Sequence, residues 1–215
     1  MLENIFNRFD SETNEIDLKE NKGIILGIYL FLISELMLFF ALFFCYFFYY
    51  YFNYNLFKIA HNFLDIKIGL FNTLLMLFSS FTIFLSYEFY LSNDKKKTFI
   101  FLFFTILFGI FFLYFKFYEY SHKIEVGLLP GYNYKNGLLP EPDRIHVFFS
   151  FYFLLTGAHI FHLIIGLFFV FLSFFFIYFR ANFLNNLIFL RFSNLYWHMV
   201  DIIWLIIFFL LYIFI

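Results

Sequence analysis

Long apolar stretches separated by short polar segments make up most of the chain after its first 22 residues. A helix needs about 20 predominantly apolar residues to cross the hydrocarbon core of a bilayer. Five stretches reach that length, at residues 24–52, 67–90, 98–120, 147–179 and 192–215. The pattern predicts an all-α integral membrane bundle of five transmembrane helices.

The polar segments indicate how the chain is organised around these spans. Residues 1–22 are polar and rich in acids, unlike a secretory signal or a transit peptide, so we expect a separate N-terminal segment before a membrane domain at 23–215. The connection at 121–146 contains all three prolines, which is typical of a loop.

Composition supports the membrane assignment and excludes one class of function. Hydrophobic residues make up 64% of the chain and charged residues 13%, whereas ordinary soluble domains carry about 25% charge. The net charge of −1 provides no large electrostatic field, so nucleic-acid binding is excluded.

The distribution of Lys and Arg predicts the orientation, because these residues are enriched on the inner side of a membrane. With the N-terminus inside, the inner segments carry eight of them: Arg8, Lys19, Lys22, Lys95, Lys96, Lys97, Arg180 and Arg191. The outer segments carry six: Lys58, Lys67, Lys116, Lys123, Lys135 and Arg144. We therefore expect the N-terminus inside and the C-terminus outside.

Polar residues within the apolar stretches are candidates for function, because an ionisable side chain inside a bilayer is costly. Glu35 is the only acid of the first span. The favoured interpretation is a neutral carboxyl that hydrogen-bonds to a neighbouring helix, and the alternative is a proton-carrying site. In the third span, Lys116 and Glu119 have the spacing of an ion pair, an ordinary pattern at a membrane boundary.

The fourth and fifth spans carry histidines. Thr156, His159 and His162 recur every three residues on one helical face, where they could ligate a metal or haem, although hydrogen bonds between helices are the favoured interpretation. In the fifth span, His198 and Asp201 share a face and could hydrogen-bond to each other, which would reduce the cost of burying both.

Taken in order, these segments resemble subunit III of the haem–copper cytochrome c oxidases. The resemblance is carried by "GIILGIYLFLISELMLFFALFFCYF" (23–47), "FNTLLMLFSS" (71–80), "FYEY" (117–120), "TGAHIFHLIIG" (156–166) and "YWHMVDIIW" (196–204). The last two look like the family's Thr-Gly-x-His-x-x-His and Tyr-Trp-His-x-Val-Asp-x-x-Trp signatures. The chain resembles the short five-helix form, without the first helix pair of seven-helix members.

The resemblance implies a non-catalytic subunit that stabilises subunit I, holds lipid and supports oxygen reduction coupled to proton pumping. No cofactor is expected on this chain, since haem and copper lie on subunits I and II. The implied intramembrane polar residues are Glu35, Asn72, Thr73, Glu119, His159, His162, His198, Asp201 and Trp204. Candidate ligands for a phospholipid such as cardiolipin are Lys95, Lys96, Lys97, Arg180 and Arg191.

The expected location is the mitochondrial inner membrane, with an organelle-encoded chain and its N-terminus in the matrix; a bacterial plasma membrane is the weaker alternative. Partners are subunits I and II, membrane lipids, and lineage-specific subunits in place of the missing helices. Two other functions stay open. One is a proton-coupled transporter using Glu35, His198 and Asp201, and the other is a haem b protein with His159 or His162 opposite His198.

Overall fold

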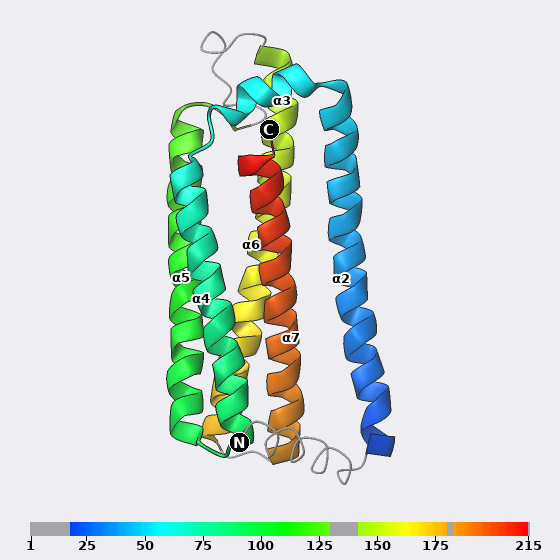
Figure 1. Ribbon diagram of the computed structural model, residues 1–215, viewed down its shortest axis with the longest axis vertical. Helices are drawn as coiled ribbons and strands as arrows, with labels where there is room; N and C mark the ends of the chain where they lie inside the picture. Colours follow the sequence, from blue (N-terminus) through cyan, green and yellow to red (C-terminus); the bar gives the residue numbers. More distant parts are fainter. Residues whose placement is uncertain (1–17, 130–141, 180–182, 215) are drawn as a thin grey trace. The chain divides into compact units, whose positions relative to one another are not determined.

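The computed structural model describes residues 18–129, 142–179 and 183–214, and these residues are almost entirely helical. In chain order the helices are α2 (Leu18–Phe52), α3 (Tyr54–His61), α4 (Ile66–Leu91), α5 (Lys95–Glu125), α6 (Pro142–Tyr178) and α7 (Phe183–Phe208), and a π-helical turn, η1 (Phe209–Ile213), follows (Figure 1). No strand occurs in these residues.

Five of these helices are long and apolar enough to cross a membrane. Their qualifying segments are Gly23–Phe52, Ile66–Leu91, Lys95–Glu125, Ile145–Tyr178 and Asn186–Ile213. The predicted fold class, an all-α membrane protein with five transmembrane helices, is confirmed. Each of the first four expected spans overlaps one helix along nearly its whole length, and the fifth overlaps α7 and η1.

Helices extend into several segments that were expected to be polar connections. α2 begins at Leu18, within the segment expected to precede the membrane domain. α5 continues to Glu125, and α6 begins at Pro142, where proline is tolerated because the first helical N–H has no partner within the helix. Residues 130–141 of the expected loop lie outside the described residues.

The chain divides into two compact units, residues 1–38 and 39–215. The described part of the first unit is the helical segment 18–38, which includes Glu35. The second unit begins within α2 and contains all later helices.

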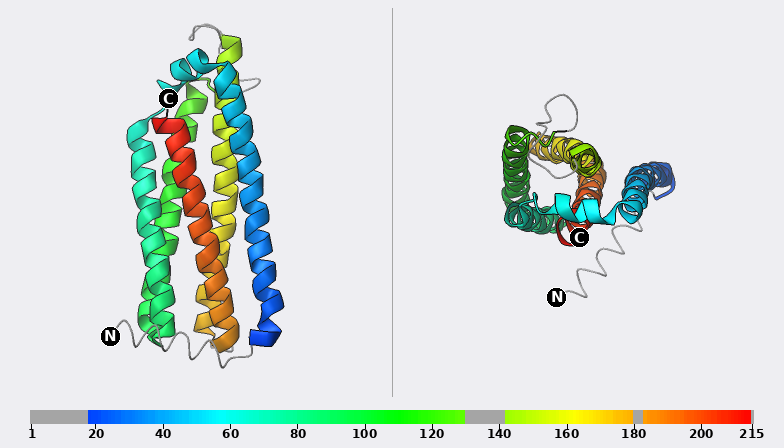
Figure 2. Two further views of the ribbon diagram at one scale, coloured as in Figure 1. Left: turned by 45° about the vertical axis from the view of Figure 1, so that its right-hand side comes forward. Right: turned by 90° about the horizontal axis from the view of Figure 1, so that it is seen from above.

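Within the second unit, α4, α5, α6 and α7 form a four-helix arrangement in which each helix packs on two others. α4 and α6 each contact both α5 and α7, and the end-on view in Figure 2 shows the four helices as the corners of a square. Small residues allow close packing: a Cβ added to Gly109 would lie 2.8 Å from Leu167 Cδ2 and 3.0 Å from the Trp197 ring.

A tight turn joins α4 to α5. Asn93 adopts a left-handed conformation with φ of 60°, which is the usual geometry after a helix end. Asp94 then caps α5, since its carboxylate accepts a 3.2 Å hydrogen bond from the backbone N–H of Lys97. The side chain of Lys97 lies 3.0 Å from the same carboxylate, and this contact holds the pKa of Asp94 below its usual value.

Candidate functional site

A buried ion pair on α5 lies at the centre of a polar cluster that joins several helices. Lys116 Nζ is 2.8 Å from Glu119 Oε2, and the two side chains are 0% and 2% exposed. Because residues three apart face the same side of a helix, the pairing follows from the sequence and is confirmed. Both side chains are buried within the four-helix packing, a feature that the spacing alone did not predict.

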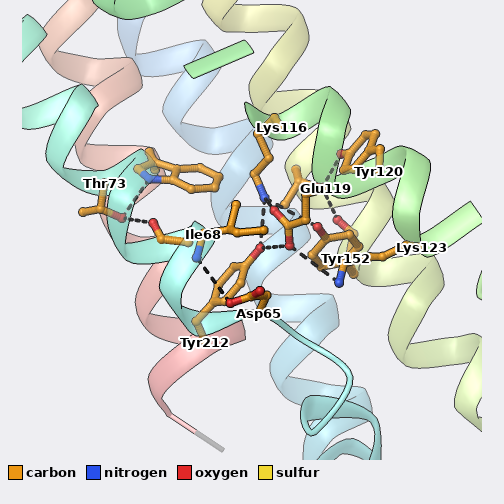
Figure 3. Close-up of polar contacts among 12 residues, drawn as sticks. Asp65, Ile68, Thr73, Lys116, Glu119, Tyr120, Lys123, Tyr152 and Tyr212 are labelled. Atoms are coloured by element: carbon orange, nitrogen blue, oxygen red, sulfur yellow. Dashed lines mark hydrogen bonds and ion pairs between the residues drawn. The ribbon is translucent and has the colours of Figure 1, made fainter. Parts of the chain in front are cut away.

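Hydroxyl groups from two other helical elements complete the surroundings of this pair (Figure 3). Lys116 Nζ donates to the hydroxyl of Tyr212 at 2.9 Å and to that of Tyr152 at 3.5 Å. The Tyr212 hydroxyl in turn donates to Glu119 Oε1 at 2.7 Å. All three N–H groups of the Lys116 ammonium therefore have acceptors, which is the condition for burying such a charge.

Aromatic rings enclose the Lys116 ammonium on the remaining sides. Its Nζ lies 4.8 Å from the Trp204 ring centroid and 5.3 Å from those of Tyr152 and Tyr212. The negative face of an aromatic ring attracts a cation, and the attraction grows where water is excluded. The rings therefore stabilise the charge while filling the core.

A second buried lysine extends the cluster toward the α3–α4 connection. Lys123 Nζ lies 3.6 Å from Glu119 Oε1 and donates a 3.2 Å hydrogen bond to the carbonyl oxygen of Phe63. We call Lys116, Glu119, Lys123, Tyr152 and Tyr212 the ion network. It joins the end of α5 to α6, to the C-terminal turn η1 and to the segment before α4.

Side chains of α2 and α3 also hydrogen-bond to backbone carbonyl oxygens of η1. The Nε2–H of His61 donates to the carbonyl oxygen of Tyr212 at 3.1 Å, and the Tyr46 hydroxyl donates to that of Leu210 at 3.3 Å. The last carbonyls of a helix have no partner within it, so these side chains satisfy groups that would otherwise be buried and unpaired.

A second set of hydrogen bonds links α4 to α7. Trp204 Nε1–H donates to the Thr73 hydroxyl and Trp197 Nε1–H to the Ser79 hydroxyl, both at 3.1 Å. His198 Nδ1 shares a 2.7 Å hydrogen bond with the Ser80 hydroxyl. The predicted hydrogen bond between His198 and Asp201 is therefore wrong, because Ser80 is the partner of His198.

Thr156, His159 and His162 lie on one face of α6, as predicted, but they make different kinds of contact. Thr156 shares a hydrogen bond with the Tyr120 hydroxyl, and His162 Nδ1–H donates to the backbone oxygen of Ala158. The ring of His159 lies 5.0 Å from that of Trp204. Both ring nitrogens of His159 lack a hydrogen-bond partner among the described residues, so His159 joins helices by ring packing and not by the predicted hydrogen bonding.

The predicted residue Asn72 is fully buried, and its side-chain amide also has no hydrogen-bond partner among the described residues. His159, His162 and His198 meet different partners, and the structure does not bring them together as a ligand set. Among the described residues, no group of three or more His, Cys, Asp or Glu side chains could hold a metal ion.

The lipid candidates occupy positions away from the ion network. Lys95, Lys96 and Lys97 are exposed at the start of α5, and Arg191 is exposed near the start of α7. Arg180 lies outside the described residues. Glu35 lies on α2 in the first unit.

Sequence reasoning missed Lys123, Tyr152 and Tyr212 as members of the site. Part of the signal was present, since Lys116, Glu119 and Lys123 recur at three- and four-residue intervals on one face of an otherwise apolar helix. The two tyrosines carry no such signal, because their hydroxyls reach the network only through packing between helices.

The fold and site define an all-helical, multi-pass membrane protein in which intramembrane polar side chains join the helices. The family model for cytochrome c oxidase subunit III matches residues 13–126 and 128–215. The chain therefore belongs to this family, whose members are subunits of haem–copper oxidase complexes. The match begins at residue 13 and so includes part of the polar N-terminal segment.

Relatives of similar length support this assignment. Subunit 3 of the cytochrome bo(3) ubiquinol oxidase of Buchnera aphidicola subsp. Baizongia pistaciae is 30% identical over 192 residues, which cover 88% of this chain and 91% of that protein. A probable quinol oxidase subunit 3 of Staphylococcus haemolyticus is 26% identical over 200 residues, covering 92% of each chain. That of Staphylococcus aureus strain USA300 is 27% identical over the same length and coverage.

Proposed function

We propose that the chain is a non-catalytic subunit III of a respiratory haem–copper oxidase, in which it stabilises the subunit that reduces oxygen. The observation that carries the proposal is the ion network. Its charged groups contact one another, and the tyrosine hydroxyls bridge them. These contacts hold the helices together. Family membership provides the complex in which such a helical unit would act.

The remaining parts of the proposal concern cofactors and partners. Haem and copper would be held by subunits I and II, and this chain would contact subunit I directly. Membrane phospholipid, such as cardiolipin, would bind at Lys95–Lys97 and Arg191. Lineage-specific subunits would occupy the positions of the two helices found only in seven-helix members.

The electron donor divides the proposal into two versions. The family resemblance predicts a cytochrome c oxidase that pumps protons in the mitochondrial inner membrane, and this stays a prediction. The names of the relatives, which are quinol oxidases, favour quinol as the donor and a bacterial plasma membrane. The transporter alternative receives no such support, because its proposed pair, His198 and Asp201, do not hydrogen-bond to each other.

Gentle solubilisation of native membranes, followed by purification through a tag on this chain, tests the proposal. We expect a haem–copper subunit I to co-purify and the complex to reduce oxygen, whereas the separated chain should show no haem absorption. Parallel assays with reduced cytochrome c and with ubiquinol identify the donor. Purification without any haem-containing partner would contradict the proposed function.

A further inference from the structure

A cavity of about 520 Å³ opens beside the ion network, between the segment that leads into α4 and the last turns of α5. Its polar lining consists mainly of Asp65, Lys67, Tyr118, Glu119, His122 and Lys123. Two of these residues, Glu119 and Lys123, are members of the ion network. The cavity therefore gives access to the buried network from outside the chain.

The charges around this cavity do not balance. When the lining is taken together with Lys116, which pairs with Glu119 behind it, three ammonium groups (Lys67, Lys116 and Lys123) stand against two carboxylates (Asp65 and Glu119), which leaves one positive charge in excess. Unbalanced charge is costly where side chains are buried, and Lys116 and Lys123 are 0% and 4% exposed. A ligand with one negative charge would remove the excess.

The hydrogen-bonding capacity that remains in the cavity is also suited to an anion. Both carboxylate oxygens of Glu119 are already occupied, one by Lys116 and the other by Tyr212. Asp65 caps α4 by accepting from two backbone N–H groups. The Lys123 ammonium contacts the Phe63 carbonyl, Glu119 and the Tyr152 ring and also lines the cavity, while Lys67 is exposed at the rim.

The position of the cavity favours an amphiphile over a soluble anion. It lies where one transmembrane helix begins, at Ile66, and another ends, at Glu125, which is the depth of lipid headgroups. The lining also has apolar surface that faces outward: Phe63, Ile66 and the ring of Tyr118 belong to residues that are 38%, 48% and 58% exposed. Basic pockets at this depth suit phosphate headgroups, and the adjoining apolar surface suits acyl chains.

We propose that this cavity binds the phosphodiester of a membrane phospholipid, held by Lys67 and Lys123, with its acyl chains along Phe63, Ile66 and Tyr118. The site differs from the one expected at Lys95–Lys97, which lies at the opposite ends of α4 and α5. The inference requires only that the chain spans a membrane, so its failure would leave the proposed function intact.

Lys67→Gln tests the proposal, because this exposed side chain can be changed without altering the buried network. The matched control is Lys58→Gln, which removes an exposed lysine on α3 that does not line the cavity. Native mass spectrometry of the purified complex should show one phospholipid fewer in Lys67→Gln than in the wild type. Lys58→Gln should match the wild type, and Lys67→Arg, which keeps the charge, should recover the lipid.

Rebinding after delipidation distinguishes the sources of the phosphate. Micelles containing phosphatidylglycerol should restore thermal stability, with binding roughly tenfold or more weaker for Lys67→Gln, the size expected for one charge-assisted hydrogen bond. Equal lipid retention by wild type and Lys67→Gln would overturn the proposal. Equal stabilisation by inorganic phosphate alone, or by a glycolipid without phosphate, would also overturn it.

Discussion

Lys116 and Lys123 are two cations buried around a single carboxylate, and this asymmetry determines what each side chain contributes. A buried ion pair offsets the cost of removing both charges from water only when the geometry and the surrounding hydrogen bonds are good. Here Glu119 contacts both lysines, whereas the lysines share no other carboxylate within ion-pair distance among the described residues. Glu119 is therefore the member whose loss leaves most charge uncompensated.

We predict that Glu119→Gln destabilises the protein more than Lys116→Met. The first change leaves two buried ammonium groups without a carboxylate, at a cost of about 3–5 kcal/mol, whereas the second leaves the Glu119–Lys123 pair in place. Thermal unfolding of the purified complex, followed by circular dichroism, measures the difference. Equal destabilisation by the two changes would show that the charge balance of the network is unimportant.

The sequence predicted the side-chain contacts of the site only where both partners lie on the same helix. The spacing of Lys116 and Glu119 was enough to predict their pair. Spacing was misleading for His198 and Asp201, because His198 hydrogen-bonds instead to Ser80 on another helix. Contacts between helices depend on helix rotation and depth, which periodicity does not specify.

At the scale of elements, the C-terminal turn η1 depends on side chains from elsewhere in the chain. His61, Lys116 and Glu119 all bond to Tyr212, through either its backbone oxygen or its hydroxyl. A π-helical turn is rare and often occurs where a side chain must be placed accurately. The turn places the Tyr212 hydroxyl between the two charges of the ion pair.

Tyr212→Phe removes that hydroxyl and keeps the ring. We expect it to cost about 1.5–3 kcal/mol of stability, the usual range for a hydrogen bond to a charged group. Tyr114→Phe on α5 is the matched control, because Tyr114 is 64% exposed and should tolerate the change. Chemical unfolding of both variants measures the effect, and similar stabilities would contradict the bridging role of Tyr212.

Helix packing gives a second test at this scale. Gly109→Ala would place a Cβ 2.8 Å from Leu167 Cδ2 and 3.0 Å from the Trp197 ring, so these side chains must shift from their packed positions. Overpacking of this kind costs about 1–3 kcal/mol, partly offset by the better helix propensity of alanine.

The control for this packing test is Gly157→Ala on α6, where an added Cβ meets no atom of the described residues within 4 Å, its own stretch of helix backbone aside. Gly109→Ala should lower the unfolding temperature, and Gly157→Ala should leave it unchanged or raise it slightly. If the two variants unfold at the same temperature, the close approach around Gly109 does not limit the packing.

Elements were more predictable than contacts, because apolar length alone identifies a span. The errors fall at the ends, where polar residues were taken as connections. Lys123 and Glu125 read as loop in the sequence, yet α5 continues through them because Lys123 is neutralised by Glu119 on the previous turn. The α7 segment before residue 192 is helical for a similar reason, since Asn186 is buried and donates to the backbone oxygen of Phe176.

For the whole molecule, the ion network changes the argument for orientation. The sequence placed six basic residues on the proposed outer side against eight on the inner side. Two of those six, Lys116 and Lys123, are buried and paired with Glu119, so they are not free charges facing the outer surface. Removing them leaves four against eight, which strengthens the prediction that the N-terminus lies inside.

Thiol labelling in sealed membrane vesicles of known sidedness tests this orientation. The single native cysteine is first removed by Cys45→Ser, and a new one is introduced at either of two exposed positions, Asn55→Cys on α3 or Ser92→Cys at the α4–α5 turn. In vesicles whose outer face is exposed, a membrane-impermeant maleimide should label Asn55→Cys at once. Ser92→Cys should react only after permeabilisation, because α4 carries the chain across the membrane between the two positions. The reverse pattern would place the N-terminus outside, and it would move the basic cluster Lys95–Lys97 to the side that the distribution of charge disfavours.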